Sequence, residues 1–244
     1  ALARVLVTSA IYRQSSRVDP EMLARDPSNR LLSRMPRLRL SAEQVRDTAL
    51  AAAGILVTDR IGGPSVTPHV PKGMLPQAFT TFVQGQSSGD DLYRRGLYTQ
   101  WHRTGHYPTF ATFDAPSREE CQVRRERSNT PLQALVLLND AAFLAAAQGM
   151  ARRTIAAHPE DVDARIGAAF EWALARPPSD QEQAILRDVH DAALAVCDEG
   201  DEDSAALATE PLGPLPADMA VDDAVAMTVA CNVILNLDEF VNRP

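Results

Sequence analysis

The residues best suited to chemistry in this chain lie in one tract, residues 93–140, where seven arginines, two histidines, a tryptophan and a cysteine precede an apolar run. A guanidinium group is always charged and presents its N–H groups in a fixed fork, so an arginine beside apolar residues needs a carboxylate or a bound anion. We therefore expect that a binding site of this protein, if it has one, lies in this tract. The candidate ligand-binding residues are Arg94, Arg95, Trp101, His102, His106, Arg118, Cys121, Arg124, Arg125 and Arg127.

The arginines of residues 118–127 have two interpretations. In the first they form an internal scaffold, with local ion pairs such as Glu120 to Arg124. In the second they join Arg94 and Arg95 in holding a sulfate, a carboxylate or a haem propionate. We favour the scaffold, because acids of the same tract can neutralise most of its positive charge.

His102 and His106 are four residues apart, a spacing that places two imidazoles on one face of a helix and suits zinc. A glycine between them and Pro108 after them oppose a helix, and no third ligand is local, so we predict no metal site. Cys121 lies among charges that would favour its thiolate if it were exposed. No catalytic triad follows from the spacing, and we predict no catalytic residue.

Aromatic residues alternate with these arginines. Such a mixture is found in platforms that stack carbohydrate or aromatic ligands, and it is also found where large side chains cover a buried helix. We favour the second use, because large aromatic residues most often serve burial. The residues concerned are Tyr98, Trp101, Tyr107, Phe110 and Phe113.

The clearest early helix is predicted over residues 42–53. Ser41 and Gln44 form a capping box at its start, and Gly54 ends it. A helical remnant is predicted over residues 1–14, from apolar residues at helical spacing.

A second strong helix start follows the arginine tract. Thr130 provides an N-cap hydroxyl, Pro131 occupies the first helical position, and Gln133 occupies the third. The run that follows is apolar on most sides, so we expect a central helix to about residue 157, with Leu135 in the core. Further helices are predicted over residues 161–175, 181–196 with Ser179 and Glu182 at its start, and 222–240.

The fold class that these signals predict is mainly α, a single helical domain over residues 1–244 with long irregular loops and little or no β-structure. Residues 54–92 are rich in Gly, Pro, Ser and Thr and predict an irregular arm. Residues 198–217 combine an acidic run with prolines and predict a flexible loop.

The composition and charge of the chain argue against several classes of function. The chain has 244 residues, 45% of them hydrophobic, enough for one substantial core. A net charge of −8 argues against duplex nucleic acid as a partner, and no stretch approaches the roughly 20 apolar residues of a membrane span. Cys121, Cys197 and Cys231 lack a metal-site spacing, and no CxxCH occurs to attach haem covalently. Either one disulfide forms, or Cys197 and Cys231 are small buried residues.

Five strings in the chain resemble, in order, the planctomycete-specific domain one family, a domain of unknown function. The resemblance extends over nearly the whole chain. The strings are TSAIYRQSSR (8–17), IGGPSV (61–66), FDAPSREECQVRRERSNTPLQALVLLND (113–140), ALARPP (173–178) and LNLDEF (235–240).

The family resemblance implies an extracytoplasmic setting, periplasmic or secreted, beside c-type cytochrome domains. Haem is then expected on a neighbouring domain of the parent protein and not on this chain. The expected partners are that cytochrome domain or operon partners, with anionic polysaccharide as a further candidate. Family members also carry a helical stretch before residue 8, so we interpret the chain as N-terminally truncated.

The leading function is a non-catalytic interaction or scaffold module. The alternative is an enzyme or carbohydrate-binding module with an arginine and aromatic pocket for an anionic or polymeric ligand.

Overall fold

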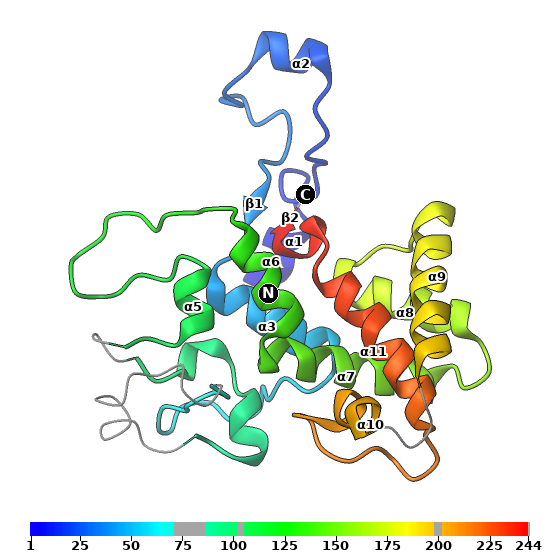
Figure 1. Cartoon of the computed structure of the whole chain (residues 1–244). Coiled ribbons are helices and arrows are strands. Elements are labelled where there is room, and N and C mark those ends of the chain that lie inside the picture. The colour runs from blue at the N-terminus through cyan, green and yellow to red at the C-terminus, as the bar shows by residue number, and fades with distance from the viewer. Residues whose placement is uncertain (71–85, 102–104, 198–201, 244) are drawn as a thin grey trace. The chain divides into compact units, whose positions relative to one another are not determined.

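The protein is mainly α-helical, as the sequence predicts (Figure 1). The part of the chain that the structure describes contains eleven α-helices, two short 3-10 helices and a two-stranded sheet. The chain contains two compact units, a smaller one of Ala1–Leu40 with Val241–Pro244 and a larger one of Ser41–Phe240. The structure is a computed structural model that describes residues 1–70, 86–101, 105–197 and 202–243.

The smaller unit contains two short helices and the sheet. The helices are α1 (Leu2–Thr8) and α2 (Pro20–Arg25), and the strands are β1 (Leu38–Arg39) and β2 (Asn242–Arg243). The strands pair antiparallel. The helix predicted over residues 1–14 is shorter than expected, because the chain enters turns after Thr8.

The core of the larger unit is built around α11 (Val221–Leu235), which packs against α7, α8 and α9. After its first turn α11 has no charged residue, and an apolar circumference of this kind suits a central helix. The surrounding helices are α3 (Ala42–Ala52), α7 (Ala141–Ala157), α8 (Val162–Leu174) and α9 (Asp180–Val196). The helix predicted over 222–240 is two helices, since α11 ends at Leu235 and α12 spans Asp238–Val241.

Two predicted helix starts are confirmed by their capping hydrogen bonds. At α3, the Ser41 N–H donates to Gln44 Oε1 at 2.9 Å and the Gln44 N–H donates back to Ser41 Oγ at 3.4 Å. At α9, the Ser179 N–H donates to Glu182 Oε2 at 2.8 Å and the Glu182 N–H donates to Ser179 Oγ at 3.3 Å. These reciprocal bonds satisfy backbone donors that a helix start otherwise leaves unpaired.

The central helix predicted from Pro131 to about residue 157 is broken in two. Helix α6 (Pro131–Asn139) meets α7 at a bend of 55°. Asp140 causes the break, because its backbone is extended and its Oδ1 accepts from the Ala142 N–H at 2.9 Å, capping a new helix. Its Oδ2 accepts from Thr109 Oγ1 at 2.5 Å.

Helix α6 also differs from the prediction at its start and on its surface. Thr130 makes no side-chain capping bond, and Gln133 instead donates to the Thr112 carbonyl at 2.9 Å. Leu135, expected in the core, has 54% of its surface exposed, whereas Leu137 has 2%. The start at Pro131 is confirmed, but the assignment of Leu135 to the core is wrong.

Part of the loop predicted over residues 198–217 is helical. Helix α10 (Glu202–Thr209) lies beside α11, and α7 holds the chain that follows it. Gln148 donates to the carbonyls of Leu207 and Glu210 at 2.7 and 2.6 Å, and Arg152 donates to that of Pro214 at 3.1 Å. Helix α10 replaces the loop expected over residues 202–209, and these bonds anchor its end and the chain that follows it.

The described parts of residues 54–92 are irregular but anchored. Val57 forms an isolated bridge with Arg94, and Val66 forms another with Thr99. The segment leads into two 3-10 helices, η1 (Gly89–Tyr93) and η2 (Gly96–Tyr98), and then into α5 (Pro108–Thr112).

No single described helix has both the length and the apolar character to cross a membrane. Helices α6 and α7 meet these two criteria only when they are taken together across their bend.

Candidate functional site

Arg94, the first candidate ligand residue, is buried and serves a turn of its own chain. Its Nη1 donates to the Pro64 carbonyl at 3.0 Å and its Nη2 donates to the Gly62 carbonyl. The guanidinium also lies 4.2 Å from the centre of the Tyr98 ring, whose hydroxyl accepts from the Gly62 N–H at 2.9 Å. Gly62 has φ +80°, a backbone conformation that favours glycine. The IGGPSV string is therefore a turn wrapped around Arg94.

Arg125 and Arg95 are directed at acids of α3. Arg125 makes a bidentate pair with Glu43, at 2.7 and 3.1 Å. Burial acts to raise the pKa of Glu43, but the hydrogen bond and charge of Arg125, together with hydrogen bonds from the Glu43 backbone and Ser41, outweigh burial, and the pKa is lowered. Arg95 Nε lies 3.6 Å from Asp47 Oδ2, and the Gly96 N–H donates to Asp47 at 2.6 Å. The pKa of Asp47 is raised, because burial outweighs these contacts.

Trp101 is the centre of a stacked cluster. His106 stacks on its ring with centroids 5.7 Å apart, and the Arg118 guanidinium lies 4.5 Å from the ring centre. The indole N–H donates to the Ser117 carbonyl at 3.3 Å. His102, the other half of the histidine pair, lies outside the described residues.

Cys121, Arg124 and Arg127 lie on the exposed loop of residues 117–128. Val123, between them, is completely exposed, and Arg124 and Arg127 make no hydrogen bond or ion pair with any residue that the structure describes. The expected pair of Glu120 with Arg124 does not form. A shallow hollow of about 500 Å³ is lined by Arg124, Arg125, Glu126, Arg127 and Ser128. The candidate residues that the structure describes therefore do not converge on one site.

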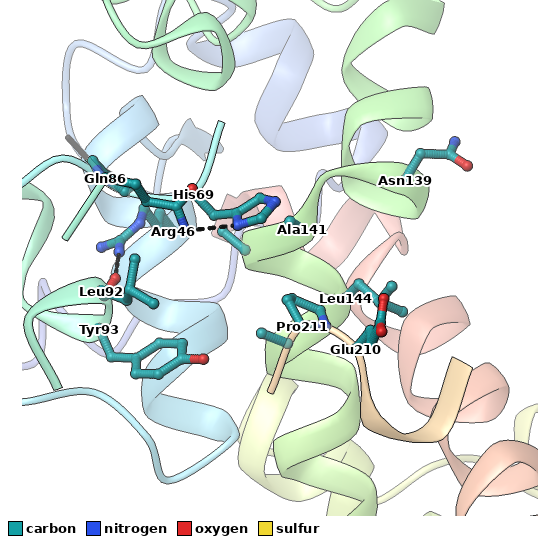
Figure 2. Close-up of a pocket in the computed structure, with 13 residues that line it drawn as sticks. Arg46, His69, Gln86, Leu92, Tyr93, Asn139, Ala141, Leu144, Glu210 and Pro211 are labelled. Carbon is teal, nitrogen blue, oxygen red and sulfur yellow. Dashed lines mark hydrogen bonds between the residues drawn. The ribbon is translucent and has the colours of Figure 1, made fainter. Parts of the chain in front are cut away.

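A different set of residues lines a pocket of about 530 Å³ (Figure 2). One wall carries Arg46, His69 and Tyr93, and the facing wall includes α7 and the Glu210 and Pro211 pair. Burial raises the pKa of the Tyr93 phenol, although the charges of Arg152 and Arg46 act in the opposite direction. The rest of the lining is Pro68, Gln86, Leu92, Asn139, Ala141, Ala142, Leu144 and Ala145.

Arg46 was not among the residues that the sequence singled out. Its side chain is 1% exposed, and its two Nη atoms donate to the carbonyls of Arg94 at 2.8 Å and Leu92 at 2.5 Å. A signal was available, because Arg46 follows Val45 and precedes Ala49 on the buried side of the predicted 42–53 helix. An arginine on the apolar face of a helix needs a buried partner.

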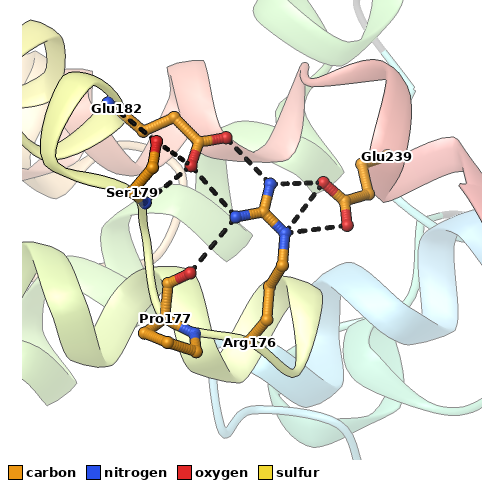
Figure 3. A network of polar contacts seen from close by, with 5 residues as sticks. All are labelled: Arg176, Pro177, Ser179, Glu182 and Glu239. Atoms are coloured by element: carbon orange, nitrogen blue, oxygen red, sulfur yellow. Dashed lines mark hydrogen bonds and ion pairs between the residues drawn. The ribbon is translucent and has the colours of Figure 1, made fainter.

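Two of the five sequence strings that carry the family resemblance meet at Arg176 (Figure 3). Arg176, in ALARPP, donates from Nη2 to Glu239, in LNLDEF, at 2.6 Å. It also donates to both carboxylate oxygens of Glu182, at 3.0 and 2.8 Å. This hydrogen bond from Arg176 is the main cause that lowers the pKa of Glu182 to about 2. Arg176 thus joins the start of α9 to α12, and these strings encode a structural clasp.

Replacing Glu182 with glutamine should destabilise the protein at neutral pH, and the effect should disappear as the pH falls below about 2. The folded-state pKa is lowered from 4.5 to about 2. The stability that the carboxylate contributes is therefore fully present above pH 4.5 and is lost as the pH falls through about 2. Melting temperatures of the parent and Glu182→Gln, followed across this range, test the prediction. The exposed Glu160→Gln is the control, and a difference that does not depend on pH would contradict it.

The three cysteines are free thiols, with Cys121 exposed, Cys197 half-buried and Cys231 buried. Burial strongly raises the pKa of the Cys231 thiol, so it remains neutral. Within the described residues, no group of three or more His, Cys, Asp and Glu side chains is placed to hold a metal ion.

The comparison with protein families gives a match to a family model. No curated protein and no solved structure matches the chain. The model of PSD1, described as a protein of unknown function (DUF1553), matches residues 1–190, a range that includes the turn around Arg94 and the 117–128 loop. Because this match covers more than half of the chain, the protein belongs to the PSD1 (DUF1553) family of proteins of unknown function.

Proposed function

We propose that the chain is a non-catalytic interaction or scaffold module of a secreted, cytochrome-associated multidomain protein, and that the 117–128 loop is its contact surface. The observation that carries the proposal is that some arginines of the tract are bound within the chain while others are exposed. Arg94 and Arg125 bind carbonyls and carboxylates of their own chain. Arg124 and Arg127 are exposed and bind no described residue, so their charges are available to a partner.

The base of this loop is fixed while its tip is exposed. Ser128 donates through its N–H and its hydroxyl to Asp114, at 2.7 and 2.8 Å. Arg125 holds the middle of the loop to Glu43 on α3. A loop ordered before binding loses little conformational entropy when a partner docks, which favours recognition. Val123, next to Arg124 in the chain, adds an exposed apolar contact.

The partner that we propose is a c-type cytochrome domain of the parent protein or its operon, in an extracytoplasmic compartment. The basis is the family resemblance, together with unpaired cations that suit an acidic surface patch. The alternative, an enzyme or a module that stacks sugars on aromatic rings, has less support. Trp101, the main aromatic candidate, is already stacked by His106 and Arg118 of its own chain.

Calorimetric titration of this chain with the cytochrome domain encoded beside it tests the proposal. We expect the double variant Arg124→Glu, Arg127→Glu to weaken binding by about tenfold or more at low salt, and by less at high salt. The matched control is Arg13→Glu, Arg17→Glu, which reverses two exposed charges elsewhere and should bind as the parent does. Absence of binding, or equal loss in both double variants, would reject the proposal. Binding of polygalacturonate in place of the cytochrome would support the sugar-binding alternative.

A further inference from the structure

We propose that the pocket beside Arg46 binds a small organic carboxylate, with the carboxylate group at the Arg46 guanidinium and the apolar body against Leu92 and Leu144. This inference is independent of the 117–128 loop and of any cytochrome partner. It depends on the incomplete pairing of a buried cation, and on the size and lining of the cavity next to it.

The charge of Arg46 is incompletely neutralised. Its side chain is 1% exposed, and the only carboxylate within ion-pair distance, among the described residues, is Asp47 at 3.7 Å. Asp47 is shared with Gly96, whose N–H donates to it at 2.6 Å, and with Arg95. The Arg46 Nε–H has no hydrogen-bond acceptor in the described structure. A buried donor and charge without full pairing cost free energy, and an anion at this position would recover that cost.

Further donors lie on the same wall. The Gln86 amide is 2.9 Å from His69 Nδ1. When the Gln86 amide donates to Nδ1, the neutral imidazole carries its hydrogen on Nε2, and this N–H can donate to a ligand. The raised pKa of Tyr93 keeps its phenol protonated at neutral pH, so this hydroxyl can donate. Both residues line the pocket with Arg46. The wall therefore offers hydrogen-bond donors to an anionic group.

The opposite wall fits the apolar part of the ligand. Leu144, Ala145 and Pro211 contribute carbon surface there, and the volume of about 530 Å³ is within the range of pockets for small molecules, about 300 to 1,000 Å³. Glu210 is the acidic residue of this wall. Its charge opposes a second anionic group at that end, which favours a monocarboxylate over a dicarboxylate.

Three probes separate the contributions of charge and shape. Phenylacetate carries a carboxylate and an apolar ring, 2-phenylethanol is its neutral counterpart, and sulfate is an anion without an apolar body. By isothermal titration calorimetry on the full chain, we expect phenylacetate to bind about tenfold or more tightly than either of the others. Equal affinities, or no binding of phenylacetate at millimolar concentration, would overturn the proposal.

Two variants locate the binding. Leu144→Trp fills the pocket without removing a hydrogen bond, and it should abolish phenylacetate binding. Leu194→Trp, the same substitution on the outer surface of α9, should not change it. Arg46→Gln should remove the preference for phenylacetate over 2-phenylethanol. If Arg46→Gln does not fold, the result with Leu144→Trp decides, because binding that persists in that variant would place the site elsewhere.

Discussion

Arg165→Ala should lower the free energy of unfolding by about 3 kcal/mol, near the lower end of the range for a broken buried ion pair. Arg165 is 4% exposed and donates to the His158 carbonyl at 2.7 Å and to Asp223 at 2.6 Å. It also donates to the Pro159 carbonyl. Alanine would leave these acceptors unpaired. Asp223 is 30% exposed and can rehydrate, which keeps the cost from reaching the upper end of the range.

Arg187→Ala is the matched control for this measurement. Arg187 makes two ion pairs, with Asp163 and Asp191, but its side chain is 41% exposed and its partners are more exposed still. Exposed pairs contribute about 0 to 1 kcal/mol, so this variant should remain close to the parent. Denaturant unfolding of both variants gives the comparison. Similar losses in the two, or a loss under about 1 kcal/mol for Arg165→Ala, would show that burial does not set the contribution of these arginines.

The helix starts at Ser41 and Ser179 could be predicted because all their determinants are local. In each, a serine and a Gln or Glu three residues later exchange hydrogen bonds, so the sequence contains both partners in one short window. The same holds for the fold class, since helical patterns with caps at both ends suffice to predict a mainly α protein.

The partners of the arginines could not be predicted, because they lie far away in the chain. Arg94 binds a carbonyl 32 residues before it, and Arg176 binds Glu239, 63 residues after it. Local spacing suggested Glu120 for Arg124, yet the arginine that pairs is Arg125, with Glu43, 82 residues away. Backbone carbonyls, like carboxylates, accept hydrogen bonds from guanidinium groups, and every residue has one. Charge counting along the sequence therefore cannot separate a scaffold arginine from a ligand-binding one.

The break between α6 and α7 shows a second limit of the sequence. Thr109 and Asp140 are 31 residues apart, and their hydrogen bond helps to hold Asp140 as the N-cap of α7. In the sequence, Asp140 was one polar residue in an otherwise continuous helical pattern. An apolar run such as Leu135 to Leu138 also has no polar residue to mark its outer face, so periodicity could not say which leucine is buried.

Leu137→Ala should therefore destabilise the protein by about 2 to 5 kcal/mol, whereas Leu135→Ala should cost less than about 1 kcal/mol. Leu137 is 2% exposed, and truncating it leaves a cavity in the core, where α6 packs against α5, α7 and α11. Leu135 is 54% exposed, so alanine there removes little buried surface and has the higher helix propensity. The two substitutions are chemically identical and lie two residues apart on one helix, so each is the control for the other. Equal losses in denaturant unfolding would mean that α6 buries both leucines, and a larger loss for Leu135→Ala would mean that the opposite face of α6 packs on the core.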